Sequence, residues 1–522
     1  MRNRWLRHGR IAVRLIVVAT TAVVGGAATI PNLMPKGEKS SVALTSSSES
    51  IAPRSAESQA PLVRSEESII GKDSQPSFGD PSPMAAAPSI AISLPNVNST
   101  PTSPSLTNSA GIERVRVYYA TDRQLFQANN PHLWITAIAP GFLSVLLTLV
   151  LVAGFFAGKR RWAWGLGSCL GLIVCYISVG QTAIKVGHLM RLAQQESVWF
   201  SGGRGAATAS YPLHLGVSDV TLPPNHQRGV IERPSVFSFE FTEREDRHVI
   251  VQRIEEMDVD SYFDSLRDRI SFSPDQSALI YVHGYNVEFE EALHRTAQIS
   301  HDIQFDGAPF LYSWPSNGRL VRYRRDESNV EWSAAHLERF LADVHKRTGV
   351  KRLHVIAHSM GNRALVGALQ LLQLKYPHEQ PMLSQVILAA PDLDTEVFRD
   401  RYASAVHTCA SQVTLYASAT DRALLASVKL HGFQRLGLTS NPQPTVAGVD
   451  LVDVTPVDTS LLGHSYYGSH PLMIRELKSL IHDGVSPEKR NWLTTLADQR
   501  MPPLWRFVPE LATQAMQSNV QR

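Results

Sequence analysis

A serine between small residues stands at the end of an apolar run, in the segment AHSMG at 357–361. The apolar residues 353–356 predict a buried strand, and residues 362–374 predict a helix. A sharp strand-to-helix turn strains its central residue and leaves room only for small side chains two positions away on either side. The pattern therefore predicts a nucleophile elbow that exposes the Ser359 hydroxyl, with Ala357 where glycine is more usual.

A serine nucleophile needs a base that takes its proton, a carboxylate that orients the base, and N–H groups that hold the oxyanion. In hydrolases built on a parallel sheet these groups follow the serine in the order acid, then histidine. The last predicted strand, 449–454, is followed by His464, which is the predicted base. His470, six residues on, is the alternative.

The acid should follow one of the two strands before the histidine. Asp421 comes after the predicted strand 413–416 and is the expected acid, while Asp392 or Asp394, after strand 385–389, is the alternative. An aspartate just after a strand also suits a turn or a helix N-cap. The sequence leaves this choice open.

Two backbone N–H groups are expected to form the oxyanion hole. One belongs to Met360, directly after the serine, and the other to Tyr285, in the segment VHGYN that follows strand 278–282. Gly284 would let this loop approach the substrate closely. The three cysteines show no metal-ligand spacing, so neither a metal nor another cofactor is expected.

The elements that must position these residues alternate along the chain. Apolar strands alternating with amphipathic helices predict a parallel sheet covered on both faces. Earlier strands are expected at 115–119, 215–220, 237–241 and 248–252. The later units are strands 278–282, 309–313, 353–356, 385–389, 413–416 and 449–454, with helices at 288–303, 330–347 and 362–374.

Composition limits the class of protein. The chain has 522 residues, which suits one enzyme domain with appendages, and its formal charge is +3. This charge is too small to indicate nucleic-acid binding, and no basic stripe with interleaved aromatic residues is present.

Three apolar segments predict contact with a membrane. Residues 1–31 have an arginine-rich head before an apolar run and predict a signal peptide or signal anchor. Residues 135–157 and 162–183 are each long enough to cross a bilayer, so 134–184 is expected to form a transmembrane hairpin. The basic turn 159–161 between them is expected on the cytoplasmic side, which places the catalytic domain on the extracytoplasmic side.

The remaining segments complete the predicted organisation. Residues 32–110 are rich in Ser and Pro and are expected to form a disordered linker. Residues 111–130 hold the first strand of the hydrolase domain, which resumes over 200–485. Residues 486–522 are expected to be a peripheral tail.

Long segments of the chain resemble one family. VHGYNVEFEEALHRTAQISHDIQFDGAPFLYSWPSNG, HVIAHSMGNRAL, VILAAPDLDTEVF and GHSYYG are similar to the bacterial α/β-hydrolases catalogued as a domain of unknown function, DUF900. VRVYYATDRQ and GVSDVTLPP resemble the N-terminal strands of that family. The resemblance implies an α/β-hydrolase fold and a triad based on Ser359, and it implies no particular substrate.

The sequence therefore predicts a membrane-anchored serine hydrolase that cleaves an ester or related acyl bond. Its expected partners are the bilayer and a small-molecule or lipid-like acyl substrate. Two alternatives remain: a catalytically silent envelope scaffold or binding protein, and a peptidase or acyltransferase that uses the same triad. The residues do not indicate an oligomeric state.

Overall fold

The structure is a computed structural model that describes residues 105–107, 111–127, 130–157, 161–205, 211–317, 323–377, 381–439, 446–457, 466–495 and 503–511. All of them fall within the compact unit Pro95–Arg522; the second unit is Met1–Leu94. The predicted signal segment, nearly all of the predicted linker, and His464 lie outside the described residues.

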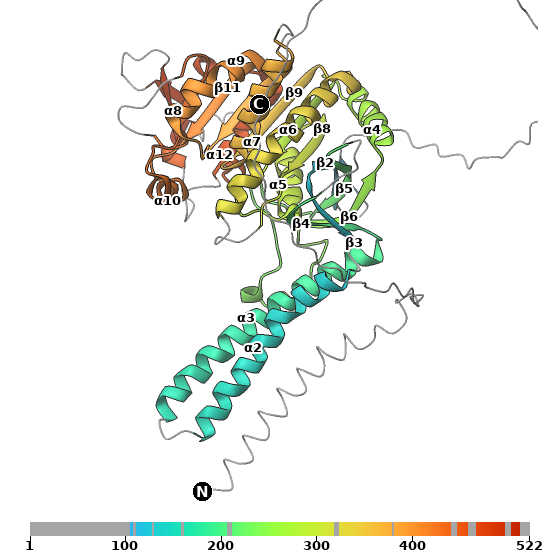
Figure 1. The fold of residues 1–522 in the computed structure, drawn as a ribbon, viewed down its shortest axis with the longest axis vertical. Coiled ribbons are helices and arrows are strands. Elements are labelled where there is room, and N and C mark those ends of the chain that lie inside the picture. The colour runs from blue at the N-terminus through green and yellow to red at the C-terminus, as the bar shows by residue number, and fades with distance from the viewer. Residues whose placement is uncertain are drawn as a thin grey trace, which may run out of the picture. The chain divides into compact units, whose positions relative to one another are not determined.

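A large, mostly parallel sheet forms the centre of the described unit (Figure 1). Its order is β13-β14-β12-β11-β10-β9-β7-β8-β2-β5-β6, with β1 beside β2. The run from β2 through β8, β7, β9, β10, β11 and β12 to β14 is parallel, whereas β1, β5, β6 and β13 join antiparallel. The strands are β1 (Ser105–Thr107), β2 (Glu113–Thr121), β5 (His214–Leu222), β6 (Ile250–Met257), β7 (Ser277–Val282), β8 (Ala308–Ser313), β9 (Arg352–His358), β10 (Leu383–Ala389), β11 (Ala410–Ala417), β12 (Asp450–Asp453), β13 (Leu493–Thr495) and β14 (Leu504–Phe507).

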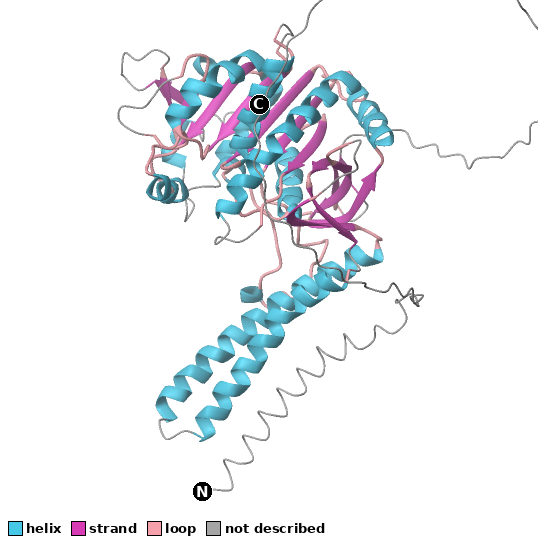
Figure 2. Ribbon diagram, in the orientation of Figure 1, coloured by secondary structure: helices cyan, strands magenta, loops and turns pink. Residues whose placement is uncertain are grey.

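Helices cover both faces of this sheet, as the alternating pattern predicts (Figure 2). Along β7, Ile280 and Val282 pack into one apolar cluster and Leu279 and Tyr281 into the other, because successive side chains of a strand point to opposite faces. The first cluster takes in α4 (Val259–Ser271), α6 (Tyr323–Thr348), α7 (Gly361–Lys375) and α9 (Ala403–Cys409), and the second takes in α5 (Phe289–Asp302) and α12 (Pro471–Lys478). Shorter helices are α8 (Thr395–Val397), α10 (Arg422–His431) and α11 (Tyr466–Ser469).

Two long apolar helices interrupt the domain between its first strands. α2 (Pro131–Ala157) and α3 (Arg161–Gln194) lie between β3 (Arg123–Gln127) and β4 (Val198–Arg204), which pair antiparallel. The segments Pro131–Phe156 and Gly167–Gln194 are long and apolar enough to cross a membrane, and only 22% and 11% of their most apolar windows are buried. β2, before this hairpin, pairs with β5, after it, so the insertion leaves the sheet continuous.

Small and hydroxyl side chains hold the two helices together. A side chain on Gly141 would lie 2.7 Å from the hydroxyl of Thr182, so glycine permits close packing there. Thr148 Oγ1 donates to the carbonyl of Gly171 at 2.9 Å, across the pair. Bonds of this kind satisfy polar groups without water, as a bilayer requires.

Three segments differ from the sequence prediction. Residues 237–241 form no strand: a short helical turn, η1 (Val236–Ser238), is followed by Phe239 in a left-handed conformation. The alternating phenylalanines mimic a strand pattern, but Phe237 and Phe239 are 77% and 75% exposed. The predicted tail contributes β13 and β14 to the main sheet, because Trp505 and Phe507 are buried against it. β1 belongs to the sheet although its residues fall within the predicted linker.

Candidate active site

Ser359 stands at the turn between β9 and α7 with φ = +53°. This left-handed conformation is unfavourable for a residue with a side chain and persists only where the surroundings enforce it. The Ser359 N–H donates to Ala389 on the neighbouring strand at 3.0 Å. The buried Asn362 side chain donates to the carbonyls of Ser359 and Ala389 at 3.0 and 3.3 Å. The turn therefore has the strained backbone of a nucleophile elbow and is held from both sides.

Close backbone contacts explain the small residues around the serine. A side chain on Gly361 would lie 2.3 Å from the carbonyl oxygen of His283, and a side chain on Gly284 would lie 2.9 Å from Ser359 Cβ. Both separations are shorter than non-bonded atoms adopt, so a side chain at either position would force the neighbouring atoms to move. The loop that carries the predicted oxyanion donor Tyr285 thus packs directly against the elbow. Met360, the other predicted donor, is fully buried at the start of α7.

The buried side chain of Arg123 holds the loop that contains His283 and Gly284 in place. Arg123 donates to Ser313 Oγ at 2.8 Å, to the carbonyl of Val287 at 2.8 Å and to His283 Nε2 at 3.0 Å. His283 Nδ1 lies 2.8 Å from the carbonyl of Gly284, so the neutral Nδ1–H tautomer satisfies both ring nitrogens. Burial lowers the pKa of His283 well below its usual value and lowers that of Arg123 to about 10.

Sequence reasoning missed Arg123 and Asn362 as residues that position the site. Arg123 ends the segment ATDR after the first strand, 160 positions before His283 in the loop that it contacts. Asn362 lies three residues after the serine and suggests only the start of a helix. Neither spacing carries a signal in one sequence, because the contacts arise when distant strands pair.

Asp421 lies after β11, two strands from the elbow. His358, Ala389 and Tyr416 stand in one row across β9, β10 and β11, so Asp421 and Ser359 leave the same edge of the sheet. Adjacent strands are about 4.8 Å apart, which separates the ends of β9 and β11 by roughly 10 Å. Asp421 is fully buried and caps α10, with Oδ1 accepting from the N–H of Leu424 at 2.9 Å. The carboxylate is thus held in a defined orientation.

The carboxylate of Asp392, the alternative acid, already interacts with two hydroxyl groups and two guanidinium groups. Its carboxylate accepts from Tyr323 Oη at 2.5 Å and from Ser427 Oγ at 2.6 Å, and it lies 3.4 Å from the guanidinium groups of Arg363 and Arg435. Burial opposes ionisation, but Arg363 and these hydrogen bonds hold the pKa of Asp392 below its usual value. This carboxylate is arranged as a structural ion-pair centre beside the elbow. Asp394 caps α8 by accepting from Glu396 and Val397.

Of the two candidate bases, the structure describes only His470. Its Nδ1 accepts from the N–H of Leu472 at 3.2 Å, so it caps α12, and burial lowers its pKa. His464 lies outside the described residues and stays a prediction as the base.

A cavity of about 700 Å³ lies beside the elbow. His358, directly before Ser359, lines it together with Tyr281 of β7. Its other walls come from α5, from residues 231–234 and from the end of α3, where Gln181 and Lys185 face it. The cavity therefore lies between the end of β9, directly before Ser359, and the part of α3 around Gln181 and Lys185.

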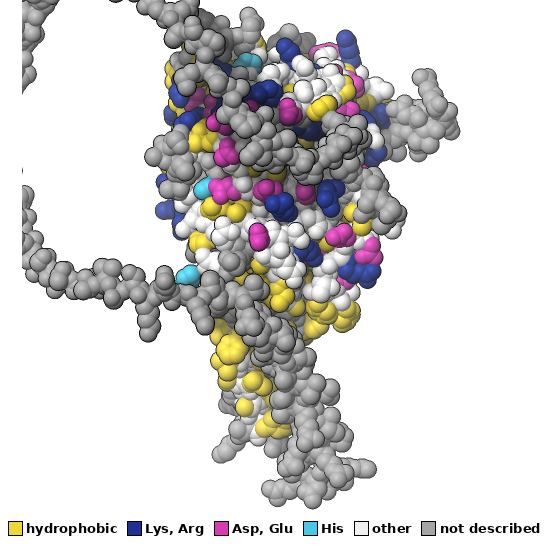
Figure 3. Space-filling model, turned by 90° about the vertical axis from the view of Figure 1, so that its right-hand side faces the viewer, with side chains coloured by type: hydrophobic (Ala, Val, Ile, Leu, Met, Phe, Trp, Pro, Cys, Tyr) yellow, Lys and Arg dark blue, Asp and Glu magenta, His cyan; other side chains and the backbone are white. Residues whose placement is uncertain are grey.

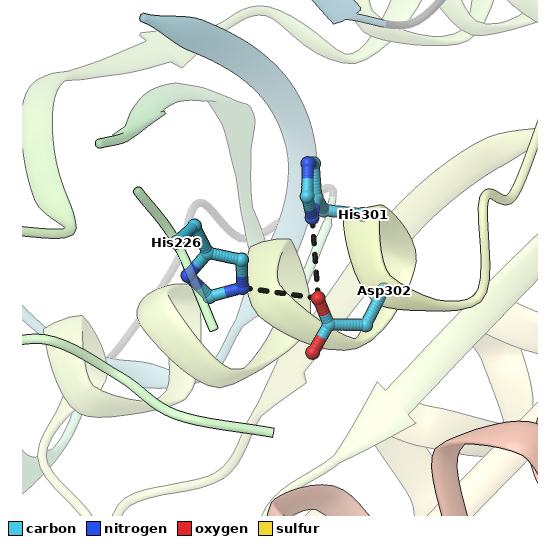
Figure 4. Close-up of side chains that lie close together, drawn as sticks. All are labelled: His226, His301 and Asp302. Carbon is cyan, nitrogen blue, oxygen red and sulfur yellow. Dashed lines mark hydrogen bonds and ion pairs between the residues drawn. The ribbon is translucent and has the colours of Figure 1, made fainter. Parts of the chain in front are cut away.

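Among the described residues, one group has the composition of a metal site (Figure 4). His226 Nε2 and His301 Nδ1 lie 3.0 and 3.2 Å from Asp302 Oδ1. The other ring nitrogens lie 2.8 Å from Glu232 and 2.9 Å from Glu113. All four nitrogens thus have carboxylate partners, and the group works as a hydrogen-bonded network.

This network is remote from the elbow. It joins the loop after β5 to the last turn of α5, about 20 Å along that helix from the end near Gly284. Burial opposes protonation of His226, but Asp302 and Glu232 raise its pKa above the usual value. Burial opposes ionisation of Asp302, but hydrogen bonds from His226 and His301 hold its pKa well below the usual range. The network therefore favours charged forms of both residues.

Comparison with known proteins agrees with this geometry. Residues 259–483 match the model of the family described as alpha/beta hydrolase of unknown function (DUF900), which confirms the resemblance seen in the sequence motifs. The matched segment contains β7, the elbow, and the strands that carry Asp392 and Asp421. Together with the mostly parallel sheet and its two helical layers, the match assigns an α/β-hydrolase fold and supports the hydrolase class.

Solved structures with low overall similarity include two hydrolases. One is a predicted CIB-like hydrolase from Thermoplasma acidophilum, 16% identical, with 40% of this chain and 88% of that chain covered and a TM-score of 0.23. The other is a mutant of the esterase rPPE, 14% identical, with 51% and 76% covered and a TM-score of 0.20. The fold assignment rests on the sheet and the family match instead of these overlaps. No curated protein sequence matches the chain significantly.

Proposed function

We propose that this protein is a membrane-anchored serine hydrolase that cleaves an ester or related acyl bond. The observation that carries the proposal is the strained backbone of Ser359, at φ = +53°, with the Gly284 loop packed against it. A strained serine turn that faces a second backbone loop is the arrangement acyl transfer needs, because the nucleophile and the oxyanion donors must meet at one carbonyl.

In the proposed reaction Ser359 Oγ attacks the acyl carbonyl while His464 takes the hydroxyl proton. The N–H groups of Tyr285 and Met360 donate hydrogen bonds to the oxyanion of the tetrahedral intermediate. The intermediate collapses as His464 gives its proton to the leaving alcohol, which leaves an acyl-enzyme. A water molecule that His464 deprotonates then hydrolyses the acyl-enzyme. The Asp421 carboxylate orients the imidazole.

The choice of Asp421 as the acid rests on the partners of the two candidate aspartates. Asp392 already holds two guanidinium groups and two hydroxyls, so its use as the acid would require this centre to break. Asp421 follows β11, the strand after which the acid more commonly lies, and its carboxylate is oriented by the hydrogen bond from the N–H of Leu424 at the start of α10.

The proposed anchor is the pair α2 and α3. Large apolar side chains cover the outside of both helices, including Phe142, Leu143 and Leu170, each more than 60% exposed. Such surfaces are stable in hydrocarbon and costly in water. With the basic turn 159–161 in the cytoplasm, the sheet domain would lie on the extracytoplasmic side.

Labelling with a fluorophosphonate probe tests the chemistry. We expect the full-length protein in detergent to label, and Ser359→Ala to lose all labelling while its melting temperature is retained. Asp421→Asn should slow labelling strongly, whereas Asp392→Asn should change it little at a temperature where both variants are folded. A folded wild type that does not label would favour a catalytically silent binding protein. If the protein labels, a panel of esters, thioesters and peptides then distinguishes esterase from peptidase or acyltransferase activity.

A further inference from the structure

A short turn in the sheet domain presents two phenylalanines away from the protein. It runs from Ser235 to Phe241 and contains η1. Phe237 and Phe239 are the most exposed of the large apolar side chains in the part of the chain that the structure describes. Most other strongly exposed apolar side chains belong to the α2–α3 hairpin. In Figure 3, hydrophobic side chains gather on the hairpin, beside the mixed charges of the sheet domain.

The turn is ordered by its own hydrogen bonds. Ser235 Oγ accepts from the N–H of Phe237 at 3.2 Å, and the carbonyl of Ser235 accepts from Glu240 at 3.0 Å. Phe239 adopts φ = +57°, an unfavourable conformation for a phenylalanine. Its N–H donates to the carbonyl of Val236 at 3.2 Å. The backbone at the tip is therefore largely satisfied within the turn, which lowers the cost of leaving water.

The turn is fixed against α3 (Figure 2). Tyr176 Oη donates to the carbonyl of Val236 at 2.6 Å, and the Tyr176 ring lies 6.0 Å from the ring of Phe239. A side chain on Gly180 would lie 2.6 Å from Val236, so glycine lets the turn reach the helix. These contacts set the position of the turn along α3.

Two polar contacts between Glu243, just after the turn, and α3 also fix the turn against the helix. Glu243 accepts from Arg191 at 2.8 Å and contacts His188 at 3.0 Å, further along α3 in the direction of the sheet domain. Within the turn, Glu240 forms an ion pair with Arg247 at 2.7 Å, which offsets the acidic charge nearest the tip.

That position lies within the apolar part of α3. Lys185 is the first charged side chain of α3 after Arg161 and marks the end of the apolar run. With a rise of 1.5 Å per residue, Gly180 lies about 7 Å and Tyr176 about 13 Å below Lys185 along the helix. Amphipathic elements at membrane surfaces bury their apolar side chains roughly 5–10 Å into the boundary between headgroups and acyl chains. The turn thus touches α3 at the depth where acyl chains begin.

We infer that the Ser235–Phe241 turn inserts into the bilayer, with Phe237 and Phe239 among the acyl chains of the leaflet next to the sheet domain. This inference rests on the proposed anchoring by α2 and α3 and adds a third point of contact. Two helices alone would let the sheet domain tilt about the hairpin. A third contact from residues before β6 fixes the face that the domain turns to the lipid.

A spin label at position 239 tests the inference without requiring catalysis. The cysteines are first removed by Cys169→Ala, Cys175→Ala and Cys409→Ala, and the full-length protein carrying Phe239→Cys is labelled with a nitroxide. It is placed in vesicles of phosphatidylethanolamine and phosphatidylglycerol at about 3:1. Power saturation then compares relaxation by oxygen, which concentrates in lipid, with relaxation by a water-soluble nickel chelate.

Two matched sites provide the controls. Leu143→Cys reports on the hairpin, and Phe272→Cys reports on an exposed phenylalanine at the end of α4. Because the side chain at each labelled position is more than half exposed, the label should not disturb folding, and unchanged melting temperatures check this.

We expect the label at 239 to resemble the label at 143, with high access to oxygen and low access to nickel. A label at 239 that resembles 272, while 143 still reports lipid, would overturn the inference and leave the anchor intact. Low access to both reagents at 239 would mean a protein contact, such as a second copy of the chain, and would also overturn it. Nickel access at 143 would refute the anchor itself, and the inference with it.

Discussion

Gly284→Ala should separate the oxyanion loop from the nucleophile without unfolding the protein. The new Cβ would lie 2.7 Å from His358 Nδ1 and 2.9 Å from Ser359 Cβ. Non-bonded carbon atoms are stable at about 3.5–4.0 Å, so relief requires a movement of up to about 1 Å between the loop and the elbow. A misplacement of 1 Å can cost about 100-fold in rate, or roughly 2.7 kcal/mol of transition-state stabilisation.

Overpacking should also lower the free energy of unfolding by about 1–3 kcal/mol. The assay is the rate of fluorophosphonate labelling, measured below the melting temperature of every variant. Gly187→Ala is the matched control: nothing lies within 4 Å of its added Cβ, and alanine suits a helix better than glycine. It should label at the wild-type rate.

A Gly284→Ala variant that labels within about threefold of the wild-type rate would refute the reasoning, because the loop could then not form part of the site. Loss of labelling together with loss of cooperative unfolding would show a structural role for Gly284 alone. The expected result is slow labelling of a protein that still unfolds cooperatively.

Three further predictions concern the acid, the histidine network and the tail. Asp421→Asn should reduce hydrolysis of a short ester by roughly 10³–10⁴-fold. Asp392→Asn should instead lower the melting temperature, since it removes the charge that pairs with the guanidinium groups of Arg363 and the buried Arg435. The pKa of His226 is raised in the folded state, so the stabilisation that protonated His226 contributes is fully present below pH 6.5 and is lost as the pH rises through the folded pKa. The melting temperature of His226→Gln should therefore lie furthest below that of the wild type near pH 6 and approach it above the folded pKa. A constant difference from pH 6 to 9 would contradict this. Glu476→Ala should lower the free energy of unfolding by about 3–5 kcal/mol, because it leaves the buried Arg490, in the predicted tail, without its carboxylate. A change under 1 kcal/mol in chemical denaturation would contradict this.

Much of the sheet could be predicted because its strands are short and apolar and its helices are amphipathic. Each predicted strand from 278 to 454 is found, since a parallel strand buried on both faces reads as an apolar run. The same reasoning was wrong for 237–241, where alternating phenylalanines follow a strand pattern but are exposed in a turn. Alternation identifies two faces of a segment and does not say whether either is buried by protein.

The candidate site divides in a similar way. The elbow pattern predicts a strained serine at 359, and the structure has it at positive φ, because the local sequence of a strand, a small-residue turn and a helix is enough to specify this geometry. The proposed choice of the acid rests on the fold. Asp392 and Asp421 both follow strands in the sequence, and only the arginines brought to Asp392 by α7 and the segment after α10 distinguish them.

By itself, the sequence determined the fold class of the domain, the position of the strained serine turn and the presence of two apolar helices, because each is encoded within a few tens of consecutive residues. The tertiary structure decided which residues support the site and how the chain closes around it. Arg123 and His283 meet only because β2 pairs beside β8, and the C-terminal strands join the sheet only because β12 offers them an edge. The exposed turn beside Tyr176 also became visible only in the fold, because its position on α3 depends on contacts between residues some 60 positions apart.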